Sequence, residues 1–214
     1  VMKHLEELDT LLKFSGASQS QHRQDLFVLS ELQFKRNGYF VEFGATNGRD
    51  ISNTWLLENY FGWQGIVAEP GTVWHQDLKA NRRCHVETRC VWSESGKTLT
   101  FNQTQNPDLS CINEYSSHDM WAYNRQHGTT YDVETISLND LLEKYNAPQE
   151  IDAPERYRIK PPKSNLSGCF CTDPPRSAET HYKAQWCPEE LFSYFCYFYD
   201  GHQKYVHDVK LLVI

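Results

Sequence analysis

Stretches of helical periodicity alternate with short apolar runs along most of this chain. Apolar residues recur at helical spacing in segments that we predict to be helices: 2–14, 24–35, 53–60, 73–80 and 138–145. Short apolar runs predict strands over 39–43 and 66–68, and further strand candidates lie at 86–91, 98–101 and 133–136. Ser52 and Ser137 stand where N-caps are favoured. The alternation predicts an α/β fold with a Rossmann-like, doubly wound, mostly parallel sheet and right-handed crossovers.

The segment between the third predicted strand and the last predicted helix has a different character. We expect 86–91 and 98–101 to form a hairpin around Ser95-Gly96. Residues 102–132 are polar and aromatic without a clear period, and they are predicted to form a long surface excursion.

The sequence GYFVEFGATNG at 38–48, with GIVAEP at 65–70, is the most informative stretch. The first strand runs into a turn with Gly44 and Gly48, and the second strand ends on Glu69. Glycine admits positive φ and lets a ligand approach the backbone, while a carboxylate at this strand end can accept hydrogen bonds from ribose hydroxyls. The pattern is typical of half a nucleotide-cofactor site. An ordinary strand-to-helix turn and a solvated acid before Pro70-Gly71 are the alternatives.

The choice of cofactor depends on the glycine spacing. Glu69 alone suits a dinucleotide as well, but the turn lacks the GxGxxG fingerprint of dinucleotide enzymes. Asn53 and Thr54 begin the helix after the turn, where amides and hydroxyls could hold a cofactor carboxylate or simply cap the helix with Ser52. Glu42 lies inside an apolar strand and needs a partner if it is buried.

Several linked motifs resemble the FkbM-type S-adenosylmethionine-dependent methyltransferases. They are SQSQHRQDLFVL at 18–29, the 38–48 stretch, ISNTWLLE at 51–58, GWQGIVAEP at 62–70, Asn81-Arg82 and TISLNDLLEKYNAPQEID at 135–152. The resemblance covers 18–152 and implies a class I methyltransferase domain. It implies methyl transfer from S-adenosylmethionine to an oxygen or nitrogen nucleophile, with a small-molecule or sugar hydroxyl as the expected acceptor.

The resemblance also implies which residues contact the ligands. The expected cofactor-binding residues are Glu42, Gly44, Ala45, Asn47, Gly48, Asn53, Thr54, Glu69, Pro70 and Val91. Val91 is placed only by its position just past the third strand, where such enzymes meet the adenine. Gln21 and Asp25 match the family's N-terminal motif and are expected to line the substrate side, the alternative being solvated polar residues. No residue can be named as the catalytic base.

The resemblance stops at Asp152, where the family continues into a further strand and this chain turns Pro-, Cys- and aromatic-rich. We therefore expect a helical lead-in at 1–17, the cofactor-binding domain at 18–152 and a divergent tail at 153–214. Unless the tail completes it, the sheet is incomplete at its C-terminal side. The alternative function is a truncated, non-catalytic methyltransferase-like fragment without an acceptor site.

Composition narrows the partners and the compartment. A net charge of -7 without a basic run disfavours nucleic-acid binding. No apolar stretch approaches the roughly 20 residues of a membrane span, and the N-terminus does not resemble a signal peptide, so the chain is predicted to be cytoplasmic. Cys169, Cys171, His181 and Cys187 do not have the spacing of a zinc site, and no metal is expected.

Overall fold

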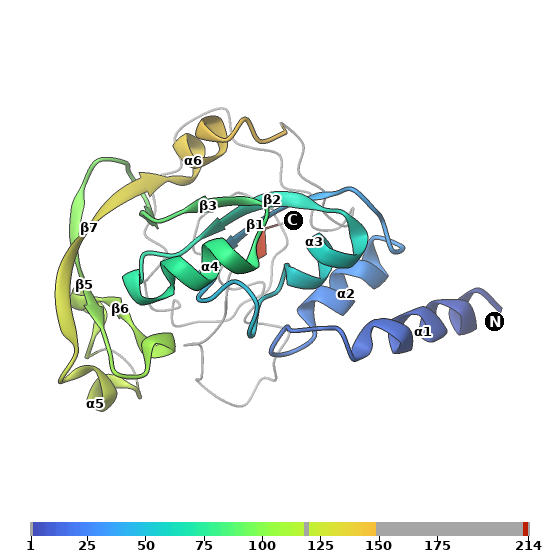
Figure 1. The fold of residues 1–214 in the computed structure, drawn as a ribbon, viewed down its shortest axis with the longest axis horizontal. Coiled ribbons are helices and arrows are strands. Elements are labelled where there is room, and N and C mark those ends of the chain that lie inside the picture. The colour runs from blue at the N-terminus through green and yellow to red at the C-terminus, as the bar shows by residue number, and fades with distance from the viewer. Residues whose placement is uncertain (1, 118–119, 149–211, 214) are drawn as a thin grey trace, which may run out of the picture. The chain divides into compact units, whose positions relative to one another are not determined.

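The computed structural model describes residues 2–117, 120–148 and 212–213 (Figure 1). These residues combine helices with parallel and mixed sheets, so the prediction of an α/β fold is confirmed. They divide into two compact units, 2–88 with 145–148 and 212–213, and 89–117 with 120–144. The sequence did not predict a division inside 18–152. Of the expected tail at 153–214, all but Leu212–Val213 lies outside the described residues.

The first unit is built around a sheet of order β3-β2-β1-β8. Its elements are α1 (Met2–Ser15), α2 (Gln24–Glu31), β1 (Tyr39–Phe43), α3 (Trp55–Phe61), β2 (Gln64–Ala68), η1 (Thr72–Trp74), α4 (His75–Asn81), β3 (His85–Glu87) and β8 (Leu212–Val213). β1, β2 and β3 are parallel, and β8 pairs antiparallel with β1. Phe43, Ala68 and Glu87 lie side by side in the register. The carboxyl ends of the three parallel strands therefore meet at one edge.

The central residues of β1 and β2 are buried on both faces of the sheet, which accounts for their mostly apolar sequences. The largest buried apolar side chains of this unit are Leu29, Phe40, Val41, Leu56, Leu57, Trp63, Ile66 and Leu78. A Cβ on Gly65 would come within 2.2 Å of the Phe40 carbonyl oxygen, so glycine allows β1 and β2 to pack closely here.

The second unit has a sheet of order β4-β7-β5-β6. Its elements are β4 (Cys90–Trp92), β5 (Thr98–Gln103), η2 (Pro107–Leu109), β6 (Cys111–Ile112), η3 (Asn113–Tyr115), α5 (Ala122–Arg125), β7 (Thr129–Ser137) and α6 (Leu138–Lys144). β4 runs parallel to β7, whereas β5 is antiparallel to both β7 and β6. Ser137 caps α6 as predicted, because its hydroxyl accepts the Asp140 amide at 3.1 Å.

Three expectations for this region are wrong. The predicted strand 86–91 is interrupted at Thr88-Arg89, and its halves β3 and β4 belong to different sheets. The predicted hairpin does not form, because β7 lies between β4 and β5. Thr135 of β7 bonds to Lys97, just before β5. The Thr135 amide donates to the Lys97 carbonyl, and the Thr135 hydroxyl accepts the Lys97 amide. The segment 102–132 is more than a surface excursion, since β6 within it pairs with β5 and places Ile112 in the core.

Helix α2 also ends earlier than predicted, at Glu31 rather than near residue 35. Gln33 and Phe34 have φ values of 51° and 57°, which are incompatible with a continuing helix. Among the described helices, none is both long and apolar enough to cross a membrane.

Candidate functional site

The turn after β1 presents its backbone at the carboxyl edge of the first unit's sheet. The amides of Gly44 and Ala45 donate to the Ala68 carbonyl at 2.9 and 3.2 Å, which ties the turn to β2. Gly44 is exposed and has φ +68°, and a Cβ built on it would meet no atom of the described residues within 4 Å. The space over Gly44 is therefore open to a ligand, and only glycine holds this φ without strain.

Gly48, at the far end of the same turn, has a different role. It has φ +80°, and a Cβ there would come within 2.7 Å of Arg82 Cγ and 2.7 Å of Leu78 Cδ1. Glycine at this position permits the close approach of α4 and the residue that follows it. The sequence predicted one role for both glycines. The geometry separates them, because Gly44 leaves space for a ligand and Gly48 leaves space for the packing of Leu78 and Arg82.

Glu69 follows β2 and is only 5% exposed. Its Oε2 accepts the Thr46 amide at 2.8 Å, and its Oε1 accepts the Gly71 amide at 2.7 Å. The carboxylate thus clamps the turn after β1 to the Pro70-Gly71 turn, and His75 Nε2 lies 2.9 Å from the Glu69 carbonyl oxygen. Ribose binding by Glu69 stays a prediction, and the backbone clamp is what the structure shows.

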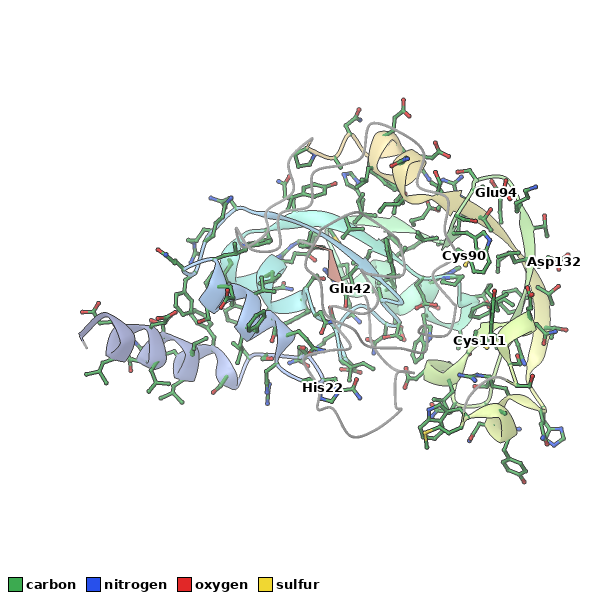
Figure 2. The ribbon with its side chains drawn as sticks, turned by 180° about the vertical axis from the view of Figure 1, so that it is seen from behind. His22, Glu42, Cys90, Glu94, Cys111 and Asp132 are labelled. Atoms are coloured by element: carbon green, nitrogen blue, oxygen red, sulfur yellow. The ribbon has the colours of Figure 1, made fainter. Side chains whose placement is uncertain are left out.

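Glu42 is completely buried in β1 and is the acceptor at the centre of a polar network (Figure 2). Its Oε1 accepts the Asn53 amide at 2.8 Å. Its Oε2 accepts the hydroxyls of Ser52 at 2.9 Å and Thr54 at 2.5 Å, and Arg82 Nη1 at 3.4 Å. These donors supply the partners that a buried carboxylate needs. This burial shows that Glu42 is not an acid exposed at the edge of the sheet. Its contact with a cofactor stays a prediction.

Arg82 connects the network to α3 and to the turn. Its Nε donates to Glu58 Oε2 at 2.5 Å, its Nη2 to Thr54 Oγ1 at 2.7 Å, and its Nη1 to the Gly48 carbonyl at 3.2 Å. Its Cζ lies 5.3 Å from the centroid of the Phe40 ring. Burial opposes the charge of Arg82, but nearby Cys84, Glu42 and Glu58 outweigh it and raise the Arg82 pKa. The guanidinium is therefore always charged.

The start of α3 is held by side chains rather than left open. Ser52 Oγ accepts the amides of Thr54 at 3.2 Å and Trp55 at 3.1 Å. The prediction of Ser52 as the N-cap is nevertheless wrong by two residues, because α3 begins at Trp55 and its N-cap is Thr54. Asn53 Oδ1 accepts the Ser20 hydroxyl at 2.7 Å, and Asn53 is 1% exposed. The side chains of Asn53 and Thr54 are thus engaged inside the protein, and their contact with a cofactor carboxylate stays a prediction.

The remaining predicted residues fall into several environments. Asn47 orders the turn, since its Oδ1 accepts the amides of Arg49 and Asp50 at 3.0 and 2.9 Å. Ala45 is fully buried beneath the turn. Val91 lies in β4, in the second unit.

The two residues predicted on the substrate side differ from each other. Gln21 is exposed, whereas Asp25 is fully buried. Asp25 Oδ1 accepts the Ser18 hydroxyl at 2.7 Å and the Leu26 amide at 2.8 Å, and Oδ2 has no hydrogen-bond partner in the described part of the chain. Burial raises the pKa of Asp25, although hydrogen bonds and Arg23 oppose the shift. Substrate contact by either residue stays a prediction.

Sequence reasoning missed Glu87, which ends β3 and is 3% exposed. Its carbonyl accepts the Glu69 amide at 3.0 Å, and its Oε1 accepts the Thr88 amide at 3.1 Å. An acid at the end of a parallel strand was the signal that identified Glu69. Glu87 was overlooked because the predicted third strand continued to Val91.

No protein-family model, curated protein or solved structure matches this chain. Within the described ranges, no group of His, Cys, Asp or Glu side chains is arranged to hold a metal ion.

Proposed function

We propose that this chain is an FkbM-type, S-adenosylmethionine-dependent methyltransferase with a Rossmann-like class I domain, acting on a small-molecule or sugar hydroxyl. The observation that carries the proposal is the open, positive-φ turn at Gly44 beside Glu69, at the carboxyl edge of parallel strands in the order β3-β2-β1. Nucleotide ligands bind outside the carboxyl ends of strands in open α/β sheets. The nearly buried Glu69 carboxylate further supports the proposal. Its hydrogen bonds from the Thr46 and Gly71 amides fix the backbone around this edge before a ligand arrives.

S-adenosylmethionine would supply an electrophilic methyl group for an in-line displacement by the acceptor oxygen. The turn at 44–48 would hold the cofactor, and the Glu69 carboxylate would accept hydrogen bonds from its ribose hydroxyls. Such a reaction needs chiefly positioning, with a base at most to take the acceptor's proton. We name no base among the described residues.

The first test is calorimetric titration of S-adenosylmethionine, and of its demethylated product, into the 214-residue chain. Binding with unit stoichiometry is expected, and no binding of a nicotinamide dinucleotide. A folded chain that binds neither methyl donor nor product would refute the proposal. Preferential binding of the dinucleotide would favour a dinucleotide-binding enzyme, because Glu69 also suits that class of cofactor. Cofactor binding with no turnover in a hydroxyl-acceptor screen would favour the non-catalytic fragment.

Two variants locate the site. Gly44→Val should abolish binding, because the side chain would occupy the open space above the turn. Gly96→Val is the matched control, since Gly96 also has a positive φ, +77°, and no atom of the residues that the structure describes lies within 4 Å of its Cβ position. Gly96 lies in the second unit. The Gly96→Val variant should share the backbone strain and leave the affinity unchanged. Equal effects of the two variants would contradict the assignment of the turn.

Glu69→Ala should weaken cofactor binding by about 1–3 kcal/mol, the range for losing hydrogen bonds to a charged group. The loss combines the missing ribose acceptor with release of the Thr46 and Gly71 amides. An unchanged dissociation constant in calorimetry would show that Glu69 does not contact the ligand.

A further inference from the structure

Two attachments hold the turn at 44–48. In the middle of the turn, Glu69 accepts the Thr46 amide. At its far end, Arg82 Nη1 donates to the Gly48 carbonyl, and the Arg82 side chain packs against the position where Gly48 lacks a Cβ. Gly44, which is exposed, precedes both attachments in the chain.

Arg82 makes two separable sets of contacts. Its Nη1 and Nη2 groups hold the Gly48 carbonyl and the hydroxyls of Ser52 and Thr54, which belong to the turn and to the start of α3. Its Nε group holds Glu58 instead. Glu58 in turn accepts the amides of Arg83 and Cys84, at 2.7 and 3.1 Å, so these hydrogen bonds anchor the segment after α4 and not the turn.

We propose that Arg82 is a positioning residue, which holds the 44–48 turn and the first residues of α3 in the arrangement that receives the cofactor. The inference rests on the function proposed above. The guanidinium suits this role because its planar, always charged fork fixes several acceptors in one geometry, which an ammonium cannot do. A turn held in its binding conformation avoids the ordering that would otherwise weaken binding.

The experiment compares Arg82→Lys with Glu58→Gln in the full chain. Arg82→Lys keeps the charge and loses the fork that holds the turn. Glu58→Gln disturbs the same buried network and should lower stability, but it leaves the hydrogen bonds from Arg82 to the Gly48 carbonyl and the Thr54 hydroxyl in place. Arg83→Lys is the exposed control, since the Arg83 side chain is 73% exposed. The readouts are amide hydrogen exchange and the dissociation constant for S-adenosylmethionine.

Arg82→Lys should accelerate exchange in a peptide covering 44–54 by about tenfold or more relative to the β2 peptide 64–68, the scale of losing one hydrogen bond to a charged group. The dissociation constant should rise by a similar factor. Glu58→Gln should accelerate both peptides in the same proportion and leave the affinity of the folded protein unchanged. If Arg82→Lys does not fold, Thr54→Val removes one Arg82 acceptor from the start of α3 and should give the same local pattern, more weakly.

The proposal is overturned if Arg82→Lys and Glu58→Gln give the same exchange pattern, or if affinity follows global stability in both. If the wild type does not bind S-adenosylmethionine, the proposed function fails, while the exchange comparison still decides whether Arg82 positions the turn.

Discussion

Arg82→Met should lower the free energy of unfolding by about 3–5 kcal/mol, the range for removing one partner of a buried ion pair. Methionine is long enough to keep most of the apolar packing, so the loss reports the polar contacts. The side chains of Arg82 and Glu42 are 0% exposed and that of Glu58 is 5% exposed, which leaves two carboxylates in the interior without their cation.

The structure places this loss at the lower end of the range. Glu42 would still accept the hydroxyls of Ser52 and Thr54 and the Asn53 amide. Glu58 would still accept two backbone amides. Because each carboxylate keeps donors, neither becomes a bare buried charge, and we expect a value near 3 kcal/mol.

Urea unfolding followed by circular dichroism and tryptophan fluorescence would measure the change. Arg83→Met is the matched control, because Arg83 is the adjacent arginine and its Nε lies 4.0 Å from Glu58 Oε1, yet its side chain is exposed. That pair should contribute less than about 1 kcal/mol. In the Arg82→Met background, Glu58→Gln should restore part of the lost stability by removing one unpaired charge. Equal losses for Arg82→Met and Arg83→Met would refute the reasoning.

Other outcomes follow from the same geometry. Gly44→Ala and Gly48→Ala should each lower the free energy of unfolding by about 1–2 kcal/mol, because both positions have a left-handed backbone. Gly48→Ala should lower it by about 1–3 kcal/mol more, because its methyl group would overpack against Arg82 and Leu78. Equal urea midpoints for the two variants would contradict this. Burial raises the Asp25 pKa, so the folded state retains its proton more tightly, and stability should fall as pH rises from 3.8 through the raised pKa. Asp25→Asn should remove this slope in urea unfolding measured across that window, and a wild type without the slope would argue against it. Burial raises the pKa of Cys84 to about 12, with Arg82 opposing the shift and Glu58 adding to it. Cys84 should therefore resist alkylation at neutral pH until urea is added, which mass spectrometry would measure.

Local sequence was sufficient where neighbours in the chain supply the partners. The strand Tyr39–Phe43 and the cap at Ser137 were predicted correctly, because apolar runs and capping hydroxyls act over a few residues. The turn after β1 was found for the same reason, since its glycines and the acid at the next strand end are visible in the sequence.

Only the tertiary structure decided the partners of the buried charges and the pairing of the later strands. The position of Glu42 inside an apolar strand indicated that it would need a hydrogen-bond donor. Nothing local identified Arg82 as that donor, because Arg82 lies 40 residues away in the chain. The predicted strand 86–91 did not show that its halves on either side of Thr88-Arg89 join different sheets, because side-chain pattern does not record which sheet a strand joins. The two glycines of the turn look alike in sequence, and their roles separate only because α4 packs on Gly48 and leaves Gly44 uncovered.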